Sequence, residues 1–85
     1  MNSISIKFFV VGEKPFQEVY EKLETPDSVL ERAYELAFDS VGYGLTHWDF
    51  VERSFNKATK QLSEIYRFNV DTTSHYQLCL KKQVL

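Results

Sequence analysis

The side chains best suited to catalysis or metal binding are two histidines and one cysteine, and none stands in a recognisable motif. His47 and Asp49 could supply two metal ligands, but no other His or Cys lies near them in sequence to complete a site. His75 lies beside an expected turn, where a cross-strand pair with Asp71 accounts for it without chemistry. We therefore predict no metal site and no catalytic histidine.

Cys79 has the wrong surroundings for a nucleophile. A reactive thiolate needs a histidine, a cation or a helix N-terminus to lower its pKa, and Lys81 is the nearest cation to Cys79 in the sequence. The three glycines, at positions 12, 42 and 44, form no phosphate-binding loop. Because paired acids, a catalytic triad and metal-ligand spacing are also missing, we predict that the chain is not an enzyme and needs no cofactor.

The composition describes one small acidic domain. With 85 residues, 44% of them apolar and 26% charged, the chain can build one hydrophobic core, so we expect residues 1–85 to form a single domain. A formal net charge of −2 disfavours a dedicated nucleic-acid binder, whose domain is usually basic. A lone cysteine cannot form an internal disulfide, and no apolar run approaches the length of a membrane span. We expect a cytoplasmic protein without membrane association.

The elements that position these side chains are organised around one helix, whose two ends are specified in the sequence. Thr25 is a suitable N-cap, Pro26 fits the first helical position, and Gly42 supplies the left-handed residue that ends a helix. On a helical wheel the apolar residues between them span an arc of roughly 200°. Because one sheet contact needs less than that, we expect this helix to be covered from two directions, by a sheet and by a helix or a second chain.

The segment before this helix is predicted to be a shorter helix over Pro15–Glu24. Its apolar residues, at positions 16, 19, 20 and 23, follow the i, i+3, i+4, i+7 spacing of one helix face. Residues 3–11 precede it and alternate between apolar and polar side chains in their first half, which is typical of a strand.

A third helix is predicted after Gly42. Thr46 and Asp49 resemble a capping box, and six apolar residues follow at 3,4,3,4,3 spacing: Trp48, Val51, Phe55, Ala58, Leu62 and Ile65. The competing interpretation is a strand from His47 to Phe55 and a second strand from Gln61 onward, with a turn at Asn56 and Lys57. We take the helix as the first choice and keep the strands as the alternative.

The last third of the chain alternates with a period of two and is predicted to form a hairpin. The apolar faces of its two strands must match if one side is to be core, which pairs Val70 with Tyr76. Asp71 then lies opposite His75, and residues 72–74 form the turn.

These elements predict an α+β fold in the order β-α-α-α-β-β. Its sheet would be three-stranded and largely antiparallel, covered on one face by the helices. The alternative order, which applies if residues 47–60 form strands, is β-α-α-β-β-β.

Surplus aromatic surface is the main indication of function. Tyr34, Phe38, Tyr43 and Phe50 exceed what one sheet face and three helices should need, which makes them candidate partner-binding residues. We expect a non-enzymatic protein that binds another protein, as an inhibitor or adaptor of a larger assembly, or that binds itself as a homodimer. Small acidic proteins that phages and other mobile elements encode to block a host complex share this composition.

The alternative function is that of a nucleic-acid-binding accessory protein. Arg53, Lys57 and Lys60 would project from one side of the expected third helix, where they could contact phosphates. Asp49 and Glu64 lie among them, which favours an ordinary solvated face. We therefore rank nucleic acid below protein as the partner.

Overall fold

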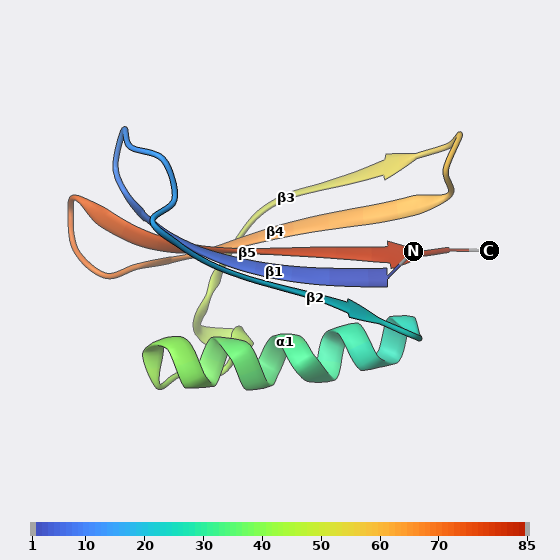
Figure 1. Cartoon of the computed structure of the whole chain (residues 1–85), viewed down its shortest axis with the longest axis horizontal. Coiled ribbons are helices and arrows are strands. Elements are labelled where there is room, and N and C mark those ends of the chain that lie inside the picture. The colour runs from blue at the N-terminus through green and yellow to red at the C-terminus, as the bar shows by residue number, and fades with distance from the viewer. Residues whose placement is uncertain (1, 85) are drawn as a thin grey trace.

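The computed structural model of the chain describes residues 2–84, which form one α-helix packed on a five-stranded sheet. The elements follow in the order β1 (Asn2–Val10), β2 (Gln17–Leu23), α1 (Pro26–Val41), the short 3₁₀ helix η1 (Leu45–His47), β3 (Asp49–Asn56), β4 (Gln61–Asn69) and β5 (Ser74–Gln83). Neighbouring strands are antiparallel, in the spatial order β2-β1-β5-β4-β3. Helix α1 runs along one face of this sheet (Figure 1).

Helix α1 begins and ends at the predicted residues. The Thr25 hydroxyl oxygen accepts a hydrogen bond from the backbone N–H of Ser28 at 3.1 Å, and Pro26 opens the first turn. Gly42 has a φ of 78° and donates its N–H to the carbonyl of Phe38 at 2.7 Å. The expected caps are therefore confirmed, and they are local enough to be encoded within a few residues at each end.

The core lies between α1 and the two central strands. Ile4 and Ile6 of β1 lie opposite Leu80 and Leu78 of β5, and all four side chains are buried. They pack with one stripe of the helix and with two residues that follow it: Val29, Ala33, Leu36, Ala37, Leu45 and Trp48. Each fully buried aliphatic side chain contributes about 1.5–3 kcal/mol relative to an exposed one, so this contact supplies most of the hydrophobic stabilisation.

The predicted order β-α-α-α-β-β is wrong, because the chain follows the order β-β-α-β-β-β. Pro15–Glu24 contains strand β2, which pairs with β1 from Asn2 opposite Leu23 to Phe8 opposite Gln17. The helical spacing of the apolar residues in this segment is not evidence of a helix, because these residues do not form a buried stripe. Phe16, Val19 and Tyr20 are exposed, and successive strand residues point to opposite faces. The alternative order β-α-α-β-β-β fails at this same segment.

The predicted third helix is also wrong. The competing interpretation is right that this segment forms two strands, β3 and β4, but His47 lies in η1 and the turn spans residues 57–60. The side-chain oxygen of Asn56 accepts hydrogen bonds from the N–H groups of Ala58 and Thr59, at 2.9 and 3.2 Å, which bends the chain into a turn. Lys60 closes this turn with a φ of 57°, a left-handed conformation that a helix excludes. Thr46 therefore caps no α-helix, and the six apolar residues spread over two strands and a turn.

The predicted hairpin register is wrong by two residues. Phe68, not Val70, lies opposite Tyr76, and Asn69 lies opposite His75. A shift of two keeps every side chain on its predicted face, so the match of apolar faces could not detect the error. Asp71 sets the register instead, because its carboxylate accepts hydrogen bonds from the N–H groups of Thr73 and Ser74, at 2.7 and 2.8 Å.

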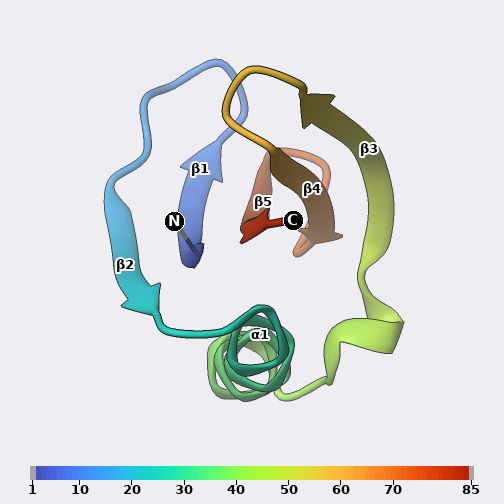
Figure 2. The same cartoon turned by 90° about the vertical axis from the view of Figure 1, so that its right-hand side faces the viewer.

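Within residues 2–84, α1 is covered by the sheet and no second α-helix packs on it, so the expected helix cover is wrong, whereas cover by a second chain stays a prediction. The helix packs on the sheet, and its outer side faces away from all five strands (Figure 2). Leu30, Tyr34 and Phe38 consequently remain exposed. The sheet it packs on has five strands rather than the three expected.

Gly42 and Gly44 offer a matched test of the helix end. An added Cβ at Gly42 would meet no atom within 4 Å, and one at Gly44 would lie 3.8 Å from Cδ1 of Tyr34. Gly42→Ala should lower the free energy of unfolding by about 1–2 kcal/mol, because alanine would be forced into the left-handed region. Gly44 has a φ of −68°, so Gly44→Ala should change stability by less than about 0.5 kcal/mol. Urea unfolding followed by Trp48 fluorescence measures both, and equal losses would contradict this account.

Candidate functional site

The four aromatic residues predicted to bind a partner are exposed and lie on the helix side of the molecule. Tyr34 is 42% exposed, Phe38 59%, Tyr43 52% and Phe50 53%. Phe50 belongs to the helix side because it lies opposite Tyr66, which in turn lies opposite the buried core residue Leu78. We refer to Tyr34, Phe38, Tyr43 and Phe50 as the aromatic surface.

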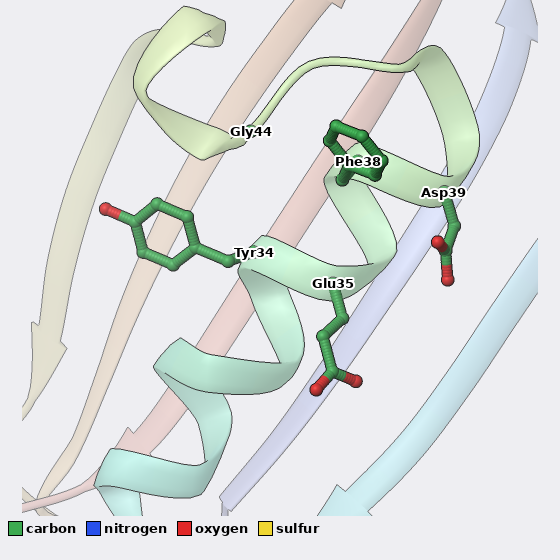
Figure 3. Close-up of a pocket in the computed structure, with 5 residues that line it drawn as sticks. All are labelled: Tyr34, Glu35, Phe38, Asp39 and Gly44. Carbon is green, nitrogen blue, oxygen red and sulfur yellow. The ribbon is translucent and has the colours of Figure 1, made fainter.

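Two of these rings border a shallow hollow on α1. Tyr34 and Phe38 are one helical turn apart and line an open depression of about 500 Å³ with Glu35, Asp39 and Gly44. Figure 3 shows the Tyr34 ring on the side of Gly44, the Asp39 carboxylate on the opposite side, and the Glu35 carboxylate below Phe38. Because Gly44 has no side chain, the Tyr34 ring stays open to solvent here.

The other two rings rest on aromatic residues of β4. Tyr43 stacks on Phe68, with ring centroids 5.9 Å apart, and lies 5.1 Å from the ring of His47. Phe50 meets Tyr66 edge-on at 5.6 Å. Such aromatic pairs contribute about 0.5–1.5 kcal/mol beyond their buried area, so both rings are held in place before any partner arrives.

A buried carboxylate supports Tyr66 from the same face of the sheet. Glu64 is 6% exposed and accepts hydrogen bonds from three groups: the Tyr66 hydroxyl at 3.0 Å, the Lys82 ammonium at 3.3 Å and the Arg53 guanidinium at 3.4 Å. Burial raises the pKa of Glu64, but these hydrogen bonds and the Lys82 charge outweigh it, so the pKa lies below its usual value. Glu64 therefore stays charged and fixes the ring on which Phe50 rests.

The aromatic surface has a helix part and a sheet part. Tyr34 and Phe38 line the hollow on α1, whereas Tyr43 and Phe50 rest on Phe68 and Tyr66 of β4. Burial and the hydrogen bond to Glu64 raise the pKa of Tyr66. Arg53 lies beside the sheet part, with its guanidinium 5.6 Å from the centre of the Phe50 ring.

The basic residues proposed for nucleic acid do not lie on a helix. Arg53 is on β3, and Lys57 and Lys60 are in the turn between β3 and β4. Arg53 is already engaged by Glu64 in an ion pair of 3.4 Å. The structure therefore does not form the predicted basic helix face.

The histidines take structural positions that differ from the predicted ones. His75 stacks on Phe9 at 5.2 Å and does not lie opposite Asp71. Burial lowers the pKa of His75, and the charge of Arg67 lowers it further. His47 is in η1 beside Tyr43.

Cys79 is half-buried on the sheet face away from α1. Burial raises the pKa of its thiol, which disfavours a thiolate. Residues 2–84 contain no group of three or more His, Cys, Asp or Glu side chains that could hold a metal ion. Their helices are too short and too polar to cross a membrane.

Sequence reasoning missed the contribution of Glu64 and Tyr66 to this site. The sequence pattern placed Glu64 on the solvated face of the expected third helix, and Tyr66 was not singled out as a site residue. Strand alternation instead puts Leu62, Glu64, Tyr66 and Phe68 on one face. Glu64 is the one acid in that series. An acid at a core-facing strand position indicates a buried ion pair, and this signal was available once residues 61–69 were taken as a strand.

Comparison with known proteins identifies no relative. No protein-family model matches the chain, and neither does any curated protein or solved structure. Its function must therefore be inferred from its own residues.

Glu64→Gln should lower the free energy of unfolding by about 1–3 kcal/mol at neutral pH, because a buried acceptor loses its charge beside two cations. The folded-state pKa of Glu64 is lowered, so its stabilisation is present above the unfolded-state pKa and is lost as the pH falls through the folded-state pKa. The stability difference between wild type and variant should accordingly narrow as the pH falls from neutral through the unfolded-state pKa and then through the lowered folded-state pKa. Urea unfolding across this range measures it.

Glu52→Gln is the matched control, since Glu52 is an exposed acid on β3. It should change stability by less than about 0.5 kcal/mol across the same pH range. A stability difference for Glu64→Gln that stays constant with pH would show that the Glu64 charge is not the source of the stabilisation.

Proposed function

We propose that this chain is a non-enzymatic protein-binding module and that the aromatic surface is its docking site. The observation that carries the proposal is the exposure of four large rings on one side of the molecule, each at least 42% exposed. Scattered exposed apolar residues are common, but contiguous apolar patches mark interaction sites. Here Tyr34 and Phe38 line one hollow, and Tyr43 and Phe50 already rest on aromatic neighbours, which reduces the entropy lost on binding.

The charges beside the hollow indicate the chemistry of the partner. Glu35 and Asp39 border Phe38, and because Glu35 is paired with Arg32, the negative charge open to a partner comes mainly from Asp39. The cation on this helix, Arg32, is occupied by Glu21 at 2.6 and 2.7 Å and by Glu35 at 2.8 Å. A partner that presents an apolar or aromatic side chain with a Lys or Arg next to it would match both features.

Binding itself would be the action of such a module. Because we identified no candidate catalytic group among residues 2–84, we propose that the protein inhibits or adapts a larger assembly by occupying a surface of it. We place it in the cytoplasm, where a single half-buried cysteine needs no disulfide partner. Nucleic-acid binding through Arg53, Lys57 and Lys60 has less support, because Glu64 already holds Arg53 and the net charge is −2.

Phe38→Ala and Phe50→Ala should each weaken partner binding by roughly one to two orders of magnitude, the value of burying one large ring. Because both rings are more than half exposed, the free energy of unfolding should change by less than about 1 kcal/mol. Affinity capture with identification of the retained protein, followed by titration of that protein, measures the first effect. Urea unfolding measures the second.

Two control variants separate binding from folding. Phe16→Ala removes a ring that is 60% exposed outside the aromatic surface and should leave binding unchanged. Leu36→Ala removes a buried core side chain and should cost about 2–5 kcal/mol of stability. If Phe38→Ala and Phe50→Ala behaved like Leu36→Ala, with no separate effect on binding, the rings would belong to the core. Equal weakening by Phe16→Ala would likewise rule out the aromatic surface as the docking site.

A further inference from the structure

Strand β2 is a regular sheet edge with exposed residues along it. Within residues 2–84 its one strand neighbour is β1, and their register runs without a shift from Gln17 to Leu23. The strand contains no proline, and Figure 2 shows it at the outer margin of the sheet. An edge of this kind presents unpaired backbone N–H and C=O groups, which proteins usually protect by a bulge, a proline or a cover. β2 is therefore suited to pairing with another strand.

We infer that β2 pairs antiparallel with β2 of a second copy of this chain, about a two-fold axis at Tyr20. Tyr20 is the midpoint of Gln17–Leu23, so this register uses the whole strand. Residues directly opposite each other in an antiparallel pair share a face. Glu18 then lies opposite Lys22 of the partner subunit, and the symmetry repeats this pair on the other side of the axis.

The ion pairs would form on the sheet face away from α1. Tyr20 lies opposite Ser5 in β1, while its neighbour Val19 lies opposite the buried residue Ile6, so Glu18, Tyr20 and Lys22 all point away from the helix. Lys7 already lies 3.6 Å from Glu18 on this face. The dimer would extend that pair into a row of alternating charge, from Lys7 through Glu18 to Lys22 of the partner subunit.

We call the proposed β2–β2 interface the seam. Its residues on the helix side carry no unpaired charge. Val19 would lie opposite Glu21 of the partner subunit. Glu21 is already neutralised by a two-pronged contact with Arg32, which holds its pKa below the usual value. The dimer interface would therefore cover part of the exposed Val19 side chain without burying a carboxylate that lacks a cationic partner.

Other registers of β2 are less favourable. A two-fold at Val19 would place Glu18 opposite Tyr20 and leave Lys22 without a strand partner. A two-fold at Glu21 would place two glutamates opposite each other, which is destabilising. The Tyr20 register is thus favoured by both its length and its charges.

The other edge of the sheet is poorly suited to self-pairing. In β3 the register shifts between Phe50 and Glu52, and such bulges disrupt edge pairing. A two-fold centred on Glu52 or on Arg53 would also place like charges opposite each other. Self-association through strand pairing is therefore assigned to β2.

The two helices would not collide in this dimer. Helix α1 packs mainly over β5 and β1 and reaches β2 through the ion pair between Arg32 and Glu21. With strands about 4.8 Å apart, helices over these strands would lie roughly 20 Å from each other across the axis. Packed helices approach to about 8–10 Å, so the seam leaves room for both.

Sedimentation velocity and equilibrium on the full chain should show a monomer–dimer equilibrium. Glu18→Lys and Lys22→Glu each turn both ion pairs into like-charge pairs, and each should weaken dimerisation about tenfold or more. Mixing the two variants gives the decisive result. One variant then carries a lysine at both positions of the seam and the other carries a glutamate at both, so every cross-strand pair between them joins opposite charges. A heterodimer should therefore form although neither variant associates well alone.

Matched charge changes on β3 and its turn serve as controls. Glu52→Lys and Lys57→Glu alter the net charge in the same way and should leave the dimer unchanged. Circular dichroism and urea unfolding establish that each variant is folded. Phe38→Ala should also leave the dimer intact, because the aromatic surface lies away from the seam, so self-association and partner capture are tested separately.

Three results would overturn the inference. One is a wild-type chain that stays monomeric up to about millimolar concentration. Another is a dimer that Glu52→Lys weakens as much as Glu18→Lys. The third is a failure of the two mixed variants to associate more tightly than either alone.

Discussion

A single α-helix has to cover the five-stranded sheet of residues 2–84, and it is too narrow to do so. A helix with its side chains is about 10–12 Å across, whereas five strands span roughly 19 Å between their outer axes. Helix α1 consequently covers the central strands, where Ile4, Ile6, Leu78 and Leu80 are buried. Both sides of the sheet, β2 on one side and β3 and β4 on the other, extend beyond the helix. Different side-chain contacts are found at each side.

The contacts at the two sides of the sheet differ. On the β3–β4 side, the Trp48 ring packs against the rings of Phe68 and Tyr76, with centroid distances of 5.7 and 6.2 Å. Glu64 forms ion pairs with Arg53 and Lys82 on this side. On the β2 side, the contact between Arg32 and Glu21 ties the helix to the edge strand. Polar side chains on the outer flank of β3 and on α1 would have been enough to face water. The large rings there stay at least 42% exposed, and this exposure is the basis of the docking site proposed above.

The sequence predicted the features that are encoded locally and failed on those that depend on distant partners. Thr25 and Gly42 specify the ends of α1 through groups within a few residues, and both predictions hold. Strand β2 pairs with β1 and has two exposed faces, so it carries no period that would mark it as a strand. The exposure of Phe50 was expected from an excess of aromatic residues. The expectation holds although Phe50 lies on a strand and not on the predicted helix. It compares the number of aromatic side chains with the number that one core can bury, and this comparison does not depend on which element carries each ring.

The proposed seam and the aromatic surface constrain each other through symmetry. A two-fold axis that continues a sheet from β2 to β2 runs perpendicular to that sheet, so it cannot exchange the two faces. Both copies of α1 would therefore lie on the same side, with their aromatic surfaces facing the same way. Two identical sites on one side of a rigid dimer raise the effective concentration of the second site once the first is bound. Such an arrangement favours a partner that presents its own docking site more than once, as a symmetric or repetitive assembly does, over a monomeric one.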